Sequence, residues 1–180
     1  MKRYVALLRG INVSGQKKIK MAELRAHLAE LGWQDIQTYV QSGNVIFESD
    51  AGDRQVLGSQ IEKKILEKYG FDVAVLVKSG EELRYILENN PFIKRGQEDT
   101  SRLYVTLLAN QPTPEALKKL ETIDHSPEEF ILDGQTIFFF SPNGYGKAKM
   151  SNNFFEQKLK VAATTRNWNT INKLVAMAEN

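Results

Sequence analysis

The sequence contains no cysteine and only two histidines among its 180 residues, which excludes several kinds of functional centre. Without cysteine there is no disulfide, no catalytic thiolate and no zinc site built on thiolates, and the composition fits a reducing cytoplasm. His27 and His125 stand in no recognisable catalytic triad or metal-ligand spacing. The carboxylates show no spacing that favours or excludes a magnesium ion. We therefore expect a cytoplasmic protein and name no metal ligand, no cofactor and no catalytic residue.

Long hydrophobic runs are also missing. No apolar stretch approaches the roughly 20 residues that span a bilayer, so we expect no membrane segment. The five apolar-rich residues 4–8 are too few for the core of a signal peptide. With 42% hydrophobic and 26% charged residues, the composition is that of an ordinary soluble globular protein.

Charge is divided unevenly along the chain, although the formal net charge is only +2. Residues 1–25 carry seven basic residues and one acidic residue, and residues 142–180 carry six and two. The middle, residues 26–141, carries eleven basic and nineteen acidic residues. If the fold brings these basic ends together, they form a positive region that favours an anionic ligand. If it does not, their lysines are solvated side chains on the surface.

Hydrophobic periodicity predicts the secondary structure. Alternating Val, Ile, Tyr and Phe predict strands at residues 3–9, 36–41, 44–48, 73–78, 102–108, 129–132, 136–140 and 161–165. Apolar spacings of three and four predict helices at residues 21–31, 54–69, 80–88, 114–120, 152–159 and 168–178. Gly32 and Gly70 are typical helix stops, and Ser79 with Glu82 has the spacing of a capping box.

The order of elements in the first half is repeated in the second. Residues 4–8 match 104–108, residues 43–47 match 134–138, and residues 73–74 match 161–162. Three matches in the same order predict two βαββαβ units, each followed by an extra helix. We place the first half at residues 1–92, a connection at 93–101 and the second half at 102–180, and expect the halves to pack as one compact unit.

Two polar segments in the first half are candidates for a ligand site. The Arg-Gly-Ile-Asn segment at 9–12 follows the first strand, and the Gln-Ser-Gly-Asn segment at 41–44 is a hairpin turn. In a split βαβ unit these lie at the same edge of the sheet, because the first two strands run in the same direction. Arg9, Asn12, Ser42 and Asn44 are the candidate ligand residues. Ser, Gly and Asn also occur in turns for purely conformational reasons.

Lysines follow the first of these segments. Lys20 stands immediately before a predicted helix, and we include it among the candidate ligand residues. Lys17 and Lys18 are expected to be solvated surface residues. All three positions contribute to the basic character of the first 25 residues.

A glycine-rich loop at residues 143–147 is the third candidate. It is not a phosphate-binding P-loop, because Ser141 and Ala148 replace the required Gly and Ser or Thr. Lys147 remains as a mobile positive charge. The topology of a split βαβ unit places this loop at the same sheet edge as the end of the last strand.

The fourth candidate is the segment Arg166-Asn167-Trp168. Arg166 ends a predicted strand, and Asn167 is a candidate N-cap of the last helix, whose N-terminus favours anions. Trp168 offers a ring that stacks on a base or sugar, or else packs inside the protein.

These motifs resemble an uncharacterised bacterial family catalogued as domain of unknown function 1697. The resemblance rests on residues 4–13, 20–21, 38–45, 90–92 and 164–170 and extends over nearly the whole chain. Ser14 departs from the family pattern, which usually has Gly-Gly at positions 14 and 15. The resemblance implies an α+β fold of two ferredoxin-like halves, and it implies no activity.

Our leading hypothesis is a small anionic ligand, such as a nucleotide or phosphorylated metabolite, bound in one cleft between the halves. Arg9 and Arg166 would be the charge partners, with hydrogen bonds from the polar residues named above. A nucleic-acid-binding protein is a less favoured alternative, because the RNA-binding signature of Lys or Arg, Gly and alternating aromatics is absent. An interaction module without any ligand is a third possibility.

Overall fold

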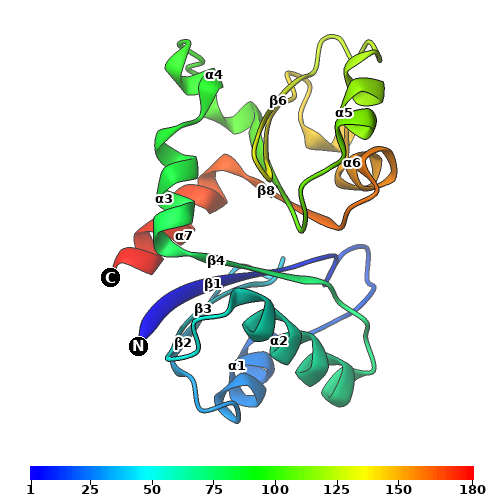
Figure 1. Cartoon of the computed structure of the whole chain (residues 1–180). Helices are drawn as coiled ribbons and strands as arrows, with labels where there is room; N and C mark the ends of the chain where they lie inside the picture. Colours follow the sequence, from blue (N-terminus) through cyan, green and yellow to red (C-terminus); the bar gives the residue numbers. More distant parts are fainter. The chain divides into compact units, whose positions relative to one another are not determined.

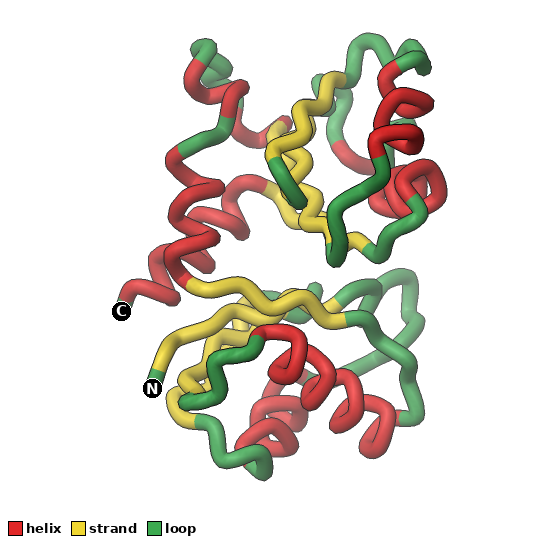
Figure 2. The backbone as a smooth tube through the Cα atoms, in the orientation of Figure 1, coloured by secondary structure: helices red, strands yellow, loops and turns green.

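The computed structural model describes residues 1–180 as eight strands interleaved with helices (Figure 1, Figure 2). The strands are β1 (Lys2–Leu8), β2 (Gln34–Tyr39), β3 (Asn44–Ser49), β4 (Val75–Ser79), β5 (Leu103–Leu108), β6 (Glu129–Asp133), β7 (Thr136–Phe140) and β8 (Ala163–Asn167). The α-helices are α1 (Met21–Ala29), α2 (Arg54–Tyr69), α3 (Gly80–Glu88), α4 (Pro91–Lys94), α5 (Pro114–Glu121), α6 (Asn152–Leu159) and α7 (Trp168–Glu179). Two 3-10 helices, η1 (Thr100–Arg102) and η2 (Tyr145–Lys147), complete the chain. No helix has both the length and the apolar character that crossing a bilayer requires.

The first four strands form an antiparallel sheet in the order β2-β3-β1-β4. β1 and β2 both run antiparallel to β3 and therefore point in the same direction, as predicted. α1 and α2 lie together on one face of this sheet (Figure 1). Their apolar side chains pack on Tyr4, Ala6 and Leu8, and the ring of Trp33 stacks on Phe47 at 4.1 Å between centroids.

The last four strands repeat this sheet in the order β6-β7-β5-β8, again with antiparallel pairing throughout. Its core contains Leu108, Ile137, Phe139 and Phe155, and α5 and α6 pack beside each other. The predicted α+β fold of two ferredoxin-like halves is confirmed by the matching strand orders.

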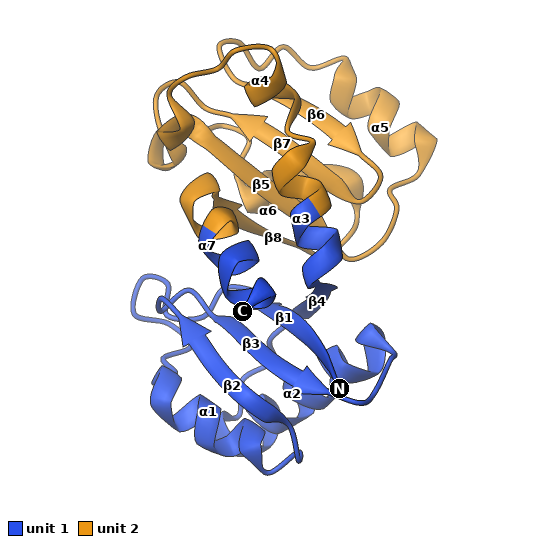
Figure 3. Ribbon diagram, turned by 90° about the vertical axis from the view of Figure 1, so that its left-hand side faces the viewer, with its two compact units in different colours: residues 1–84, 173–180 blue, residues 85–172 orange.

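The chain divides into two compact units (Figure 3). Unit 1 contains residues 1–84 and 173–180, and unit 2 contains residues 85–172. The boundary falls inside α3 and inside α7, so the end of the chain belongs to unit 1. Residues 91–94, which span the end of the predicted first half and the start of the predicted connection, form the short helix α4. The Asn90 side chain accepts the N–H of Phe92 as its N-cap.

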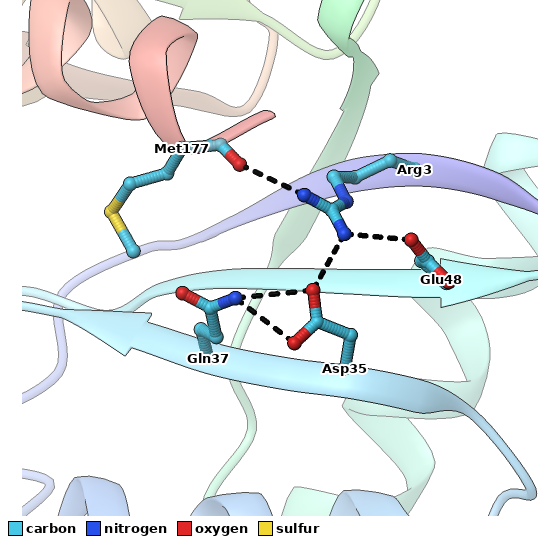
Figure 4. A network of polar contacts seen from close by, with 5 residues as sticks. All are labelled: Arg3, Asp35, Gln37, Glu48 and Met177. Carbon is cyan, nitrogen blue, oxygen red and sulfur yellow. Dashed lines mark hydrogen bonds and ion pairs between the residues drawn. The ribbon is translucent and has the colours of Figure 1, made fainter. Parts of the chain in front are cut away.

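Arg3 fastens the end of α7 to the unit 1 sheet (Figure 4). Its guanidinium lies 2.6 Å from a carboxylate oxygen of Asp35 and 2.7 Å from one of Glu48, and it donates to the main-chain oxygen of Met177 over 3.4 Å. The side chain is 17% exposed. One arginine therefore joins β1, β2, β3 and the last turns of the chain.

The two units differ most in the lengths of two connections, and comparing the corresponding loops shows which lengths the fold requires. From β1 to α1 the chain takes the twelve residues 9–20, whereas β5 to α5 needs only the five residues 109–113. From β7 to α6 it takes the eleven residues 141–151, whereas β3 to α2 needs only the four residues 50–53. The fold itself does not require the longer loops, and each contains one of the candidate motifs.

Candidate functional site

The loop of residues 9–20, between β1 and α1, has an unusual backbone that one side chain holds in place. Asn12, Ser14 and Lys17 all have positive φ angles, which L residues rarely adopt. The Asn12 side chain donates to the main-chain oxygens of Ile19 and Gln41 over 3.0 and 2.7 Å, and accepts the N–H of Ile19 over 2.8 Å. Both amide hydrogens of Asn12 are therefore used by the protein.

The β2–β3 turn packs against this loop, as the topology predicted. The N–H of Leu8 donates to the oxygen of Gly43 over 2.8 Å. The buried Asn44 amide donates to the oxygen of Tyr39 and to the Ser42 hydroxyl over 2.9 and 3.2 Å. Val40, a β-branched residue, has a φ angle of +53° in this turn. Strained residues of this kind are concentrated at ligand sites more often than elsewhere.

A pocket of about 290 Å³ opens beside the same loop. It is lined by Arg9, Lys17, Glu62, Asp72, Val73 and Ala74. The Lys17 ammonium donates to the main-chain oxygen of Asp72 over 2.6 Å, and the N–H of Arg9 donates to the oxygen of Ala74 over 2.9 Å. Two cations and two carboxylates thus share one small polar pocket.

Lys17 corrects one expectation and is the residue that sequence reasoning missed. It is half-buried in the pocket wall instead of extending into solvent. Its partner Asp72 stands 55 residues further along the chain, so no local pattern marks the pair. Lys20, by contrast, is a surface residue with 84% of its side chain exposed, 3.7 Å from Glu23.

In unit 2 the glycine-rich loop is fastened to the start of β5 by two tyrosines. The N–H of Tyr145 donates to the Tyr104 hydroxyl over 3.2 Å, and the two rings lie 5.1 Å apart. The Tyr145 hydroxyl accepts the N–H of Asn152 over 2.8 Å. The loop and the end of β8 therefore share an edge, as predicted, while the Lys147 side chain is exposed.

Arg166 lies on β8 and is only 8% exposed. Its guanidinium donates to the Thr164 hydroxyl over 2.7 Å and to the main-chain oxygen of Thr165 over 3.0 Å. Burial lowers the pKa of Arg166 to about 10, and the nearby Tyr145 acts in the opposite direction. The side chain therefore remains a cation at neutral pH, in surroundings that screen its charge poorly.

The two residues after Arg166 have structural roles. The Asn167 side chain accepts the N–H of Thr170 over 2.8 Å and is the N-cap of α7, as predicted. Trp168 is 4% exposed, so its ring packs inside the protein and offers no open face for stacking. In unit 1, Asn12 likewise holds the backbone, and both hydrogens of the Asn44 amide are used within the turn.

The structure brings the motifs together in pairs. The first and second candidates meet at one edge of the unit 1 sheet, and the third and fourth meet at one edge of the unit 2 sheet. The two pairs belong to different units. A single cleft served by both pairs stays a prediction. No group of three or more His, Cys, Asp or Glu side chains is placed to hold a metal ion.

Comparisons with known proteins agree with this fold. The chain is similar to a solved structure described as a conserved bacterial protein from Streptococcus pneumoniae, with 27% identity, a TM-score of 0.78 and coverage of 98% of both chains. No curated protein matches the sequence. A family model described as a protein of unknown function, DUF1697, matches residues 1–138. Because this match covers more than half of the chain, the chain belongs to the DUF1697 family.

Proposed function

We propose that this protein binds a small anionic ligand, with Arg9 and Lys17 of unit 1 as its first charge partners. The observation that carries the proposal is the pocket in which both cations stand, beside a loop of twelve residues that the pseudo-repeated unit replaces with five. The positive φ angles of this loop, which Asn12 holds by hydrogen bonds, cost conformational free energy, and strained backbone of this kind is typical of ligand sites.

Arg166 supports the same chemistry in unit 2. A guanidinium that is mostly removed from water attracts an anion more strongly than an exposed one, because the surroundings screen its charge less. Arginine also presents the planar set of donors that binds phosphate or carboxylate through two hydrogen bonds. We therefore propose Arg166 as a cationic ligand residue in unit 2, and Lys147 as an exposed cation at the same sheet edge.

The asparagines change role in this proposal. An anion needs hydrogen-bond donors, and both amide hydrogens of Asn12 are already used by main-chain oxygens. Asn12, Asn44 and Asn167 therefore position the loops, and we expect no direct contact between Asn12 and the anion. Ser42 is exposed at the β2–β3 turn and stays a proposed ligand residue.

The burial of both sheets argues against RNA binding in the manner of an RNA-recognition module, which stacks bases on an open sheet face. Tyr4, Ala6 and Leu8 face the helices in unit 1, so Val5 and Leu7 face the other side, and both are fully buried. Val105 and Leu107 are fully buried on the corresponding face of unit 2. Gel shifts with RNA and DNA at low salt test this alternative directly.

A thermal-shift screen of sugar phosphates, aminoalkyl phosphates and nucleotides tests the proposed function. A ligand at about 100 times its Kd stabilises the folded state by about 2.7 kcal/mol, which raises the Tm of a chain this long by about 5 to 10 °C. We expect such a shift for wild type and Lys18→Gln, and a smaller one for Arg9→Gln and Lys17→Gln. A library in which no anion raises the Tm, or equal shifts in all four proteins, would contradict the proposal.

A further inference from the structure

The pocket beside the long loop is mixed in charge, which restricts the ligand further. Arg9 and Lys17 provide two positive charges, and Glu62 and Asp72 provide two negative charges. One oxygen of the half-buried Glu62 carboxylate accepts the N–H of Val75 over 2.9 Å, which fixes the group in the wall. A carboxylate held in this way weakens the binding of a ligand that carries only negative charge, because it repels it, and strengthens the binding of a ligand that also carries a positive group.

The size and lining of the pocket disfavour a nucleotide. Its volume of about 290 Å³ is at the lower limit of ligand pockets, which run from about 300 to 1,000 Å³. No aromatic side chain lines it, and the buried Trp168 of unit 2 offers no face for a base. The pocket therefore suits a molecule of a few heavy atoms beyond the anionic group.

We propose that the ligand is a small phosphorylated amine, with a phosphate and a protonated amino group in one molecule. A phosphate monoester carries about −1.5 to −2 charge at pH 7, which matches the two cations Arg9 and Lys17. The amino group donates to the oxygen of Glu62 that does not accept the Val75 N–H, with Asp72 as the second acidic neighbour. This inference rests on the proposed function and adds the class of ligand.

The test is a set of calorimetric titrations with 2-aminoethyl phosphate, ethyl phosphate and adenosine monophosphate. A hydrogen bond between two charged groups contributes about 1.5 to 3 kcal/mol, so we expect 2-aminoethyl phosphate to bind at least about tenfold more tightly than ethyl phosphate. Glu62→Gln removes that difference, because the amide keeps an oxygen for the Val75 N–H but loses the charge. Glu67→Gln, on the same helix but outside the pocket, retains it.

The outcomes separate the two proposals. Equal affinities for the two alkyl phosphates in wild type, or tighter binding of adenosine monophosphate, overturn the phosphorylated amine and leave the anion site standing. Binding of none of the three compounds overturns the proposed function as well. If Glu62→Gln does not fold, the ratio of the two wild-type affinities still decides the question.

Discussion

The side-chain amide of Asn12 donates to the main-chain oxygen of Gln41 over 2.7 Å, and so joins the loop after β1 to the β2–β3 turn. The same side chain makes two further hydrogen bonds to Ile19. One residue thus fixes the entry to α1, the path of a strained loop and the spacing between two motifs. The candidate pocket depends on that loop, because Arg9 stands just before the positive-φ residues of the loop and Lys17 is the last of them.

Replacing Asn12 by alanine is expected to lower the free energy of unfolding by about 2 to 3 kcal/mol. The change leaves the main-chain N–H and oxygen of the buried residue Ile19 without their partner, and a buried polar group without a hydrogen bond costs about 1 to 3 kcal/mol. Water can replace the lost donor at the exposed Gln41. Urea titrations measure the effect. Gln16→Ala, at an exposed position of the same loop, is the control with an expected change below about 0.5 kcal/mol. A neutral Asn12→Ala would contradict the assignment of Asn12 as the residue that holds the loop.

Gly43→Ala is expected to destabilise the protein by about 3 kcal/mol. A Cβ at this position would lie 2.7 Å from Ile11 Cδ1 and 2.9 Å from Leu8 Cβ, and the φ angle of +90° disfavours any L side chain. Gly96 has a similar φ angle of +97° but open space around it, so Gly96→Ala reports the backbone effect alone, about 1 kcal/mol. Equal losses of unfolding free energy in the two variants would show that a Cβ at position 43 does not clash with Ile11.

The sequence predicted the regular elements well because their signals are local. The predicted bounds of α2, α3, β7 and α6 coincide with the structure, and the capping box of Ser79 and Glu82 forms both of its hydrogen bonds. Periodicity and caps act within a few residues, which is the range that a sequence pattern contains.

The long loop escaped prediction because distant residues determine its shape. Asn12 is held by Gln41, 29 residues away, and Lys17 by Asp72, 55 residues away. The topology predicted that this loop meets the β2–β3 turn, but no spacing marks Gln41 or Asp72 as the individual partner. No glycine accounts for the left-handed φ angles at Asn12, Ser14 and Lys17. The sequence therefore identified where the motifs lie but not which side chains line the pocket.

Glu82→Gln is expected to destabilise unit 1 at neutral pH by about 1 kcal/mol, allowing for solvent screening. Burial alone would raise the pKa of Glu82, but the Ser79 N–H and the cations Arg54 and Lys78 outweigh it and lower the pKa below its ordinary value of 4.5. The stabilisation is therefore present above pH 4.5 and is lost as the pH falls through the lower pKa of the folded state. Unfolding curves of both proteins from pH 7 to pH 3 should converge, and a constant difference would contradict this assignment.

A residue-resolved NMR titration with inorganic phosphate tests the anion site most directly. The account predicts saturable shifts in the amide signals of residues 9–20 and 72–74, which surround the pocket of Arg9 and Lys17. The Kd obtained from these shifts should rise at least about tenfold in Lys17→Gln, since a hydrogen bond to a charged group contributes about 1.5 to 3 kcal/mol. Lys18→Gln, which removes the same charge at the neighbouring exposed position, should leave them unchanged. Shifts confined to other residues, or equal weakening in both variants, would contradict the account.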